Sequence, residues 1–331
     1  MTEHIHHHEI KMYGDIKLFA GSGSPILAQK VGEYLDQKLS PREVIQFPNE
    51  NIFIKLKSSV RGQDVYVIQT TSSPVHYNLM ELLIMIQTIR LDSAARITAV
   101  IPYLAYGRSD KKDQPRVPIT ARLVADMIES AGADRYITMD PHAGQIQGFF
   151  SIPGDVLTAS HMISAHIRDH MLASMKDPVV VATDLGFAKK GRNYALDLNV
   201  PIAFIEKRRH GNDANAEALT LIGEVADRDV IIVDDEVDTG GSIAQAVGVV
   251  KNHGARDVYL AFIHPIFSRN AAQRLADLPI KHILTTDTVP IPAEKMLPLE
   301  GRVTVLSIAS MLGEVIRRAH EGRSVGEMFN E

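Results

Sequence analysis

The 331-residue sequence contains no cysteine. This absence excludes disulfide bonds and thiolate metal sites, so neither can stabilise the fold. The N-terminal stretch is acidic and does not resemble a secretory signal. Together these features predict a cytoplasmic location.

Long apolar segments and an excess of positive charge are also missing. The longest apolar run, residues 79–86, is interrupted by Glu81 and is much shorter than the roughly 20 residues that span a bilayer. We therefore expect no membrane segment. A formal net charge of −5 argues against a nucleic-acid surface binder. The stretch His4 to His8 is compatible with a metal-binding tract, a tag remnant or a frayed terminus.

What is present indicates a folded α/β protein. Hydrophobic residues make up 45% and charged residues 23% of the chain, as in soluble globular proteins. From Asp64 onward, short apolar runs alternate with helical patterns, which is typical of βαβ units and a parallel sheet. The expected strands are Val65–Gln69, Ile97–Ile101, Arg135–Met139, Val179–Ala182, Ile202–Ile205, Val230–Val233 and Val258–Phe262.

The length predicts two domains, because a single core rarely grows to this size. We place them at residues 1–154 and 155–308, since residues 151–159 are rich in polar residues, proline and glycine. A C-terminal helix at about 309–321 is expected to pack back on the first domain. Two similar stretches, 132–137 and 254–259, lie 122 positions apart and reflect either duplication or a chance likeness of turn residues.

Helix boundaries follow from capping residues. Asn78 is expected to cap a helix whose apolar residues 79, 82, 83 and 86 keep helical spacing. Pro118 is expected in the first turn of a second helix, which ends at Gly132.

The strongest local pattern is a strand, a loop and a helix near residue 240. The apolar strand Val230–Val233 leads into the acidic and glycine-rich run 234–242, and apolar residues at helical spacing follow. Gly240 and Gly241 permit a tight turn that brings backbone N–H groups toward an anion. The helix N-terminus adds partial positive charge. The pattern therefore predicts a phosphate-binding loop.

Two carboxylates, Asp234 and Asp235, precede this loop. They can accept hydrogen bonds from a pair of sugar hydroxyls or hold a hydrated magnesium ion. Beside a bare phosphate they would repel the ligand, so hydroxyls or a metal ion should lie between them and the phosphate. The alternative is a solvated acidic turn before a glycine-rich helix start.

The motif resembles the ribose-phosphate loop of type I phosphoribosyltransferases and of ribose-phosphate diphosphokinases. The resemblance to the diphosphokinases extends over nearly the whole chain. Matching stretches are 16–21, 60–62, 78–82, 101–103, 116–120, 145–150, 207–209 and 264–268. In this order and spacing they are highly specific.

This resemblance implies two similar phosphoribosyltransferase-like domains, each a mainly parallel sheet flanked by helices. It implies transfer of the β,γ-diphosphate of Mg-ATP to the C1 hydroxyl of ribose 5-phosphate, giving phosphoribosyl diphosphate and AMP. Family members form homodimers that assemble into homohexamers. Two alternatives remain, a base phosphoribosyltransferase and a non-catalytic regulatory subunit.

The resemblance also assigns roles to individual residues. Lys207 and Arg209 match the catalytic pair, at the root of a loop that is expected to be mobile; otherwise they form a solvated basic turn. The ribose 5-phosphate site comprises Asp234, Asp235, Asp238, Thr239, Gly240, Gly241 and Ser242. The ATP site comprises Phe47, Asn49, Asn51, Arg108, Ser109 and Asp110. The diphosphate loop is Asp184, Leu185 and Gly186, and Mg²⁺ is assigned to His142 and Asp184.

The assigned ATP site departs from the family at its adenine-reading residues. Asn49 and Asn51 stand where the family has acids, and Phe47 precedes them. The resemblance implies that a neighbouring subunit supplies this segment. Asparagine can still accept a hydrogen bond from the adenine amino group, but it also offers donors. The preferred base is therefore left open.

Overall fold

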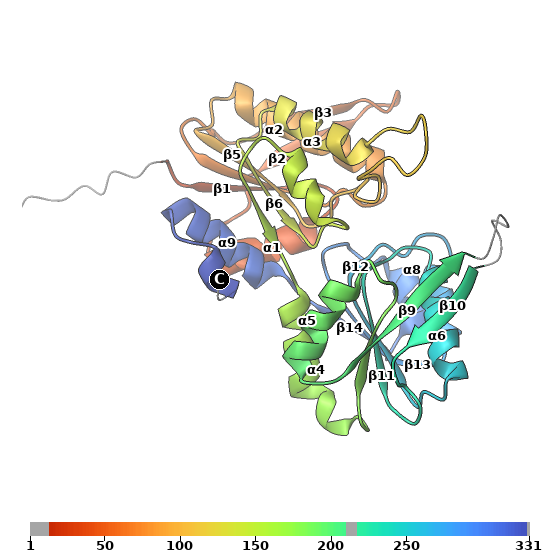
Figure 1. The fold of residues 1–331 in the computed structure, drawn as a ribbon. Coiled ribbons are helices and arrows are strands. Elements are labelled where there is room, and N and C mark those ends of the chain that lie inside the picture. The colour runs from red at the N-terminus through yellow and green to blue at the C-terminus, as the bar shows by residue number, and fades with distance from the viewer. Residues whose placement is uncertain (1–12, 210–216, 330–331) are drawn as a thin grey trace, which may run out of the picture.

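The computed structural model describes residues 13–209 and 217–329. They form two lobes, each built around a mainly parallel sheet with helices against it (Figure 1). The expected α/β class is confirmed. The stretch His4 to His8 lies outside the described residues.

The first lobe contains a parallel sheet of five strands in the order β1-β4-β5-β6-β7. Its strands are β1 (Ile16–Ala20), β4 (Asp64–Ile68), β5 (Arg96–Ile101), β6 (Arg135–Met139) and β7 (Gly154–Leu157). Helices α2 (Val75–Leu91) and α3 (Thr120–Ala131) cover one face, and α1 (Pro25–Leu35) and α9 (Ala309–Glu321) cover the other. Because both faces are covered, the strands are almost continuously apolar. A separate hairpin, β2 (Arg42–Gln46) and β3 (Ile52–Leu56), packs against α2.

The second lobe contains a seven-stranded sheet in the order β10-β9-β8-β11-β12-β13-β14. Its strands are β8 (Val179–Ala182), β9 (Ile202–Arg209), β10 (Glu217–Ile222), β11 (Val230–Val237), β12 (Val258–Pro265), β13 (Ile280–Thr286) and β14 (Val303–Leu306). Only the β9–β10 pair is antiparallel within this sheet as described. Helices α4 (Ser160–His170) and α5 (Ala188–Leu198) cover one face, and α6 (Gly241–Asn252) and α7 (Ala271–Ala276) cover the other.

Short helical turns complete the chain. They are α8 (Ala293–Met296) and the 3-10 turns η1 (Gly144–Phe149), η2 (Leu172–Ser174), η3 (Leu297–Leu299) and η4 (Gly326–Phe329). Across the described ranges 13–209 and 217–329, no helix has both the length and the apolar composition needed to cross a membrane.

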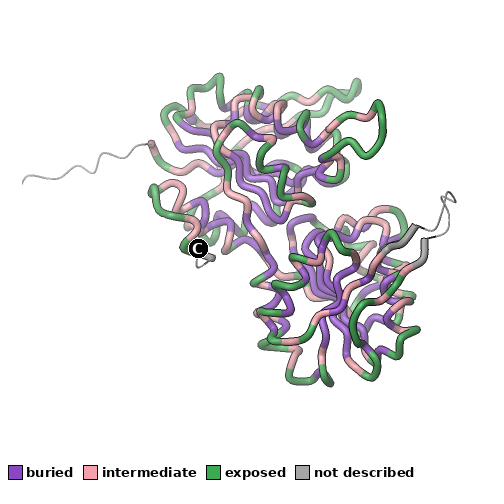
Figure 2. Tube along the Cα trace, viewed as in Figure 1, coloured by how far each residue is buried: buried purple, intermediate pink, exposed green. Residues whose placement is uncertain are grey.

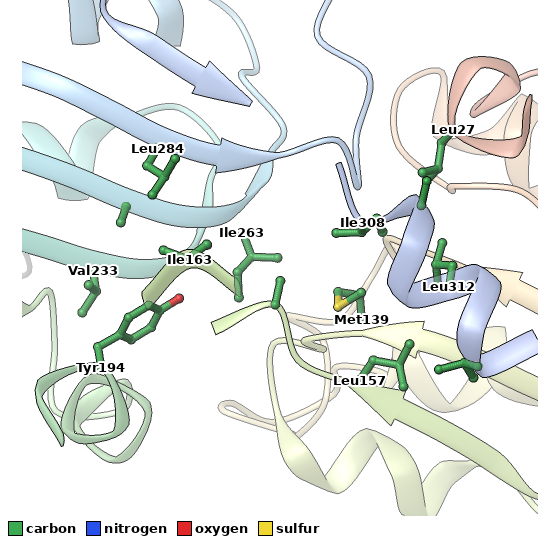
Figure 3. Close-up of a cluster of buried hydrophobic side chains, with 14 of the residues drawn as sticks. Leu27, Met139, Leu157, Ile163, Tyr194, Val233, Ile263, Leu284, Ile308 and Leu312 are labelled. Atoms are coloured by element: carbon green, nitrogen blue, oxygen red, sulfur yellow. The ribbon is translucent and has the colours of Figure 1, made fainter. Parts of the chain in front are cut away.

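One buried apolar cluster runs through both lobes. Figure 3 shows Met139 and Leu157 of the first sheet, Val233 and Leu284 of the second, and Ile308 between the lobes. The buried strands of both sheets stand out in Figure 2. Polar contacts support the same junction: the Oγ1 of Thr70 donates to the carbonyl of Thr288 at 2.8 Å, and Lys30 pairs with Asp287 at 3.1 Å. The lobes are therefore held together by apolar packing as well as by polar contacts.

The C-terminal helix α9 returns to the first lobe after β14. Tyr66 donates from its hydroxyl to the carbonyl of Ile316 at 3.4 Å, and Arg96 donates to that of Ala319 at 3.0 Å. His320 on α9 lies 2.8 Å from the buried carboxylate of Asp64. Strand β7 extends the first sheet to Leu157, and the division at residue 154 stays a prediction.

Two capping predictions were wrong. Asn78 lies inside α2, where its side chain donates to the carbonyl of Ser72 at 2.8 Å, and Pro74 occupies the N-cap. Pro118 precedes Ile119, the N-cap of α3, and is not in the first turn. The expected C-cap was confirmed, because Gly132 has φ 110° and ends α3.

All seven expected strands were found, and in the second lobe β9, β11 and β12 extend beyond the expected bounds. Strand β11 continues through Val237, so Asp234 and Asp235 belong to the strand and not to the loop. The reason is tertiary: β12 continues beside β11 and pairs with it as far as Val237. Strands β1, β2, β3, β7, β10, β13 and β14 were not anticipated.

Candidate active site

A pocket of about 200 Å³ lies where the two lobes meet. Arg108 and His142 reach it from the first lobe, after the carboxyl ends of β5 and β6. The second lobe supplies the rest of the lining, Asp184, Asp234, Asp235, Glu236, Val237, Asp238, Thr239, Gly240, Gly241, Ser242 and Ile243. Ligands of open parallel sheets bind at this edge, beyond the carboxyl ends of the strands.

The loop between β11 and α6 has the geometry of an anion site. Gly240 is the N-cap of α6 with φ 73°, a left-handed conformation that favours glycine. Arg274 on α7 donates to the carbonyl of Thr239 at 2.7 Å, and this hydrogen bond helps to fix the loop conformation. The first N–H groups of α6 have no partner within the helix, and they are available to a phosphate.

The two aspartates on β11 have different electrostatic surroundings. Burial and the neighbouring Asp235 raise the pKa of Asp234 well above its usual range. Burial would also raise the pKa of Asp235, but the hydrogen bond and charge of His142 lower it to about 2. The pair therefore tends to hold one proton, as adjacent buried carboxylates do. Sugar hydroxyls or a cation would relieve this crowding.

His142 connects the lobes through Asp235. Its Nδ1 lies 2.8 Å from the Asp235 Oδ2, and this hydrogen bond is the main reason that the pKa of His142 is raised. The carboxylate orients the ring and leaves Nε2 free to act as a ligand or a donor. Carboxylates commonly orient metal-binding histidines in this way.

A second link between the lobes joins Arg108 to Glu236. The Arg108 Nε forms an ion pair with Glu236, and its Nη1 lies 3.6 Å from the Asp238 carboxylate. Burial and the Glu236 carboxylate raise the pKa of the nearby Tyr103 phenol. Sequence reasoning missed Glu236 and Tyr103. The only available signal for Glu236 was its position within the acidic run.

The expected diphosphate loop reaches the pocket through one residue. Asp184 lines the pocket, and its Oδ1 accepts a hydrogen bond from the backbone of Phe187 at 2.8 Å. Leu185 and Gly186 are not part of the lining. Lys190, in the first turn of α5, donates to the carbonyl of Pro141 at 3.3 Å, and its charge lowers the pKa of Asp235. Sequence reasoning did not identify Lys190.

Two expected ATP-site residues make contacts within the protein. Asp110 is buried and accepts a hydrogen bond from the Gln145 side chain. The Ser109 Oγ accepts from the backbone N–H of Thr120 at 3.3 Å, at the start of α3. In this structure their side chains organise the loop that carries Arg108.

The remaining predicted residues lie away from the pocket lining. Phe47, Asn49 and Asn51 occupy the exposed turn of the β2–β3 hairpin, where the Asn49 side chain accepts from the Asn51 backbone at 3.3 Å. Lys207 and Arg209 belong to the end of β9, and their side chains lie outside the described part of the structure. The adjoining stretch 211–216 is likewise outside it, whereas Glu217 and Ala218 belong to β10.

The protein groups of this pocket could hold Mg²⁺ only if the phosphates of a bound substrate supplied further metal ligands. Among residues 13–209 and 217–329, no group of three or more His, Asp or Glu side chains is arranged to hold a metal ion. Mg²⁺ usually keeps several waters and binds through one or two protein groups together with phosphates. The excess of carboxylates over cationic groups in the lining also favours a cation.

Comparisons with known proteins agree with this architecture. Residues 16–132 match the model of the N-terminal domain of ribose phosphate pyrophosphokinase, and residues 212–330 match the phosphoribosyl synthetase-associated domain. The ribose-phosphate pyrophosphokinase of Caldanaerobacter subterraneus is 44% identical over 95% of this chain and 98% of its own length. That of Haemophilus influenzae is 43% identical over 96% and 99%.

A solved structure supports the same relation in three dimensions. Phosphoribosylpyrophosphate synthetase from Mycobacterium smegmatis is similar with a TM-score of 0.88 and 40% identity, over 93% of this chain and 99% of that one. Sequence and fold therefore agree along nearly the whole length. The chain belongs to the ribose-phosphate pyrophosphokinase family of enzymes.

Proposed function

We propose that the protein transfers the β,γ-diphosphate of Mg-ATP to the C1 hydroxyl of ribose 5-phosphate. The products are phosphoribosyl diphosphate and AMP. One observation carries this proposal: a phosphate loop with an acidic pair in the second lobe shares one pocket with Arg108 and His142 of the first. Two substrates bound from opposite lobes would meet there.

Ribose 5-phosphate suits the side of the pocket formed by β11 and α6. The loop Asp238–Ser242 and the N-terminus of α6 would receive the 5-phosphate. Asp234 and Asp235 would accept hydrogen bonds from the ribose hydroxyls, which removes the crowding of two adjacent carboxylates. Residues 155–308 would then be the sugar-phosphate domain.

The ATP phosphates suit the opposite side, in the domain assigned to residues 1–154. Arg108 presents a guanidinium, whose planar fork matches phosphate oxygens. Mg²⁺ would be held by His142 and Asp184 together with the phosphates, and it would neutralise charge that develops during transfer. Leu185 and Gly186 would approach the diphosphate through their backbone.

In the reaction, the C1 oxygen attacks the β-phosphorus and its proton is lost. The bond between the β-phosphorus and the α,β-bridging oxygen breaks, and AMP leaves. Lys207 and Arg209 would stabilise the negative charge on the transferred group, because this chemistry depends on positioning and cationic groups.

The adenine side of the site would be completed by another subunit. Phe47, Asn49 and Asn51 lie on an exposed hairpin, away from the pocket lining of their own chain. A homodimer, assembling further into a homohexamer, would bring this hairpin to the ATP site of a neighbour. Ser109 and Asp110 would support Arg108 from within the same chain.

The test is to incubate the purified protein with Mg-ATP and ribose 5-phosphate, with and without inorganic phosphate. AMP and phosphoribosyl diphosphate are followed by chromatography. Equal amounts of both should form, and Lys207→Ala should abolish them. Lys281→Ala removes an exposed lysine that pairs with Asp257 and should keep activity. Nucleotide binding without AMP formation would favour a regulatory subunit instead.

A further inference from the structure

Glu236 is a buried carboxylate that lines the pocket. The reaction proposed above gives it no role. Its side chain is 4% exposed, on β11 between Asp235 and Val237. Its charged partner, Arg108, belongs to the other lobe and is 54% exposed. Burial raises the pKa of Glu236, and the charge of Arg108 opposes that rise.

The contact constrains how Arg108 faces the pocket. The Nε of Arg108 faces Glu236, while its Nη1 is 3.6 Å from Asp238 and makes no close hydrogen bond there. A guanidinium has five N–H donors in a rigid plane, so pairing through Nε leaves the Nη groups for another anion. The exposed end of Arg108 therefore presents a fork toward the pocket.

The pair is expected to persist when an anionic ligand arrives. Moving Arg108 away would leave the Glu236 carboxylate buried without its cation, which is strongly unfavourable. Burial would lower the pKa of Arg108, but Glu236, Asp238 and Asp235 raise it, so the guanidinium stays charged. A ligand that engages Arg108 through the Nη groups avoids this loss.

We propose that Glu236 is a positioning residue: from the sugar-phosphate lobe it holds Arg108 with its Nη groups directed at the triphosphate of ATP. This rests on the proposed function, in which Arg108 contacts ATP. The consequence is that β11, which carries the acids for ribose 5-phosphate, also sets the affinity for ATP.

The first test is Glu236→Gln, which keeps the shape and removes the charge. We expect KM for ATP to rise about tenfold, in the range for loss of one charge-assisted contact. The KM for ribose 5-phosphate and kcat should change less than twofold, a split that a general loss of structure would not produce. Glu224→Gln, at an exposed position away from the pocket, is the matched control and should leave all three unchanged.

The second test is a double-mutant cycle with Arg108→Lys, which keeps a positive charge but loses the fork. If Glu236 acts through Arg108, adding Glu236→Gln to Arg108→Lys should raise KM for ATP by less than a further twofold. Additive effects would overturn the proposal. So would an unchanged or lower KM for ATP in Glu236→Gln, since a lower value would mean that Glu236 competes with phosphate for Arg108.

Two further measurements separate the possible failures. If the wild-type protein makes no AMP, the proposed function fails, and binding of non-hydrolysable α,β-methylene-ATP by calorimetry then tests Glu236 by itself. The same ranking of dissociation constants supports the positioning role, and equal constants refute it. If Glu236→Gln does not fold by circular dichroism, Glu236→Asp takes its place, because it keeps the charge but shortens the reach toward Arg108: a raised KM for ATP supports the proposal, and an unchanged one overturns it.

Discussion

His264 lets the contact between the lobes be tested through pH. It lies on β12 of the second lobe and is 2% exposed. Its Nε2 is 3.2 Å from the carbonyl of Asp140 in the first lobe, and its Nδ1 is 2.9 Å from the Thr288 hydroxyl. The Tyr103 ring packs edge-on against it, with centroids 5.1 Å apart. A protonated His264 would therefore lose its hydration here and gain few interactions that offset the loss.

Burial lowers the pKa of His264 from 6.5 to about 4. Between these two values the unfolded chain binds a proton that the folded protein does not, so stability falls as pH falls through this window and levels off below the lower value. A tenfold change in an equilibrium is worth about 1.4 kcal/mol. The free energy of unfolding should therefore drop by about 2 kcal/mol between pH 8 and pH 5, and by about 3 kcal/mol near pH 4, from this residue alone.

The measurement is urea unfolding of the wild type and His264→Gln at several pH values from 8 to 4.5. Other groups titrate in both proteins, so the difference between the two curves isolates His264. That difference should change by about 2 kcal/mol between pH 8 and pH 5. His253→Gln, at the exposed C-cap of α6, should follow the wild type. Parallel curves for wild type and His264→Gln would refute the reasoning.

Three further predictions concern the site and the core. Asp235→Asn should lower the pKa of His142, because the hydrogen bond with Asp235 is the main cause of its rise, and NMR of labelled histidine would show it. Leu312→Ala, fully buried on α9, should cost about 2–5 kcal/mol in urea unfolding, whereas Leu123→Ala, 55% exposed on α3, should cost less than about 0.5. Gly240→Ala places a side chain at φ 73° and should cost about 1–2 kcal/mol and weaken binding of ribose 5-phosphate, measured by calorimetry.

Most central strands of both sheets were predictable from the sequence, and β13 was the exception. The strands β6 and β8 have the predicted bounds, because strands buried on both faces are short, continuous apolar runs. The edge strands were not predictable in this way. Strand β14 is only partly buried, and β10 begins with Glu217, so neither is a continuous buried apolar run. Their pairing depends on neighbours that the local sequence does not reveal.

Helix starts were the least predictable feature. Asn78 has good capping chemistry, but its side chain bonds to Ser72, because α2 starts earlier at Val75. By contrast, Gly132 was predictable as a C-cap, since a left-handed residue at a helix end strongly favours glycine. A glycine signals a backbone conformation, whereas an asparagine has several competing hydrogen-bond partners.

The pocket residues also differ in how well local sequence predicts them. Gly240 and the acids of β11 were found because they form one contiguous motif. Arg108 and His142 were found through resemblance, since they stand far from that motif in the chain. Glu236 was passed over within the motif, because its importance comes from the arginine that the other lobe places against it.

The shared core explains why these distant pairs can be specific. Met139 at the end of β6 and Val233 in β11 belong to one apolar cluster, and His142 and Asp235 follow them by a few residues each. The packing of the two sheets thereby sets the 2.8 Å contact between His142 and Asp235. Because close-packed interiors transmit strain, a change in this cluster should alter the pairing of the lobes before it alters either loop alone. The geometry of the pocket is thus a property of the junction between the lobes, and neither half of the chain contains it by itself.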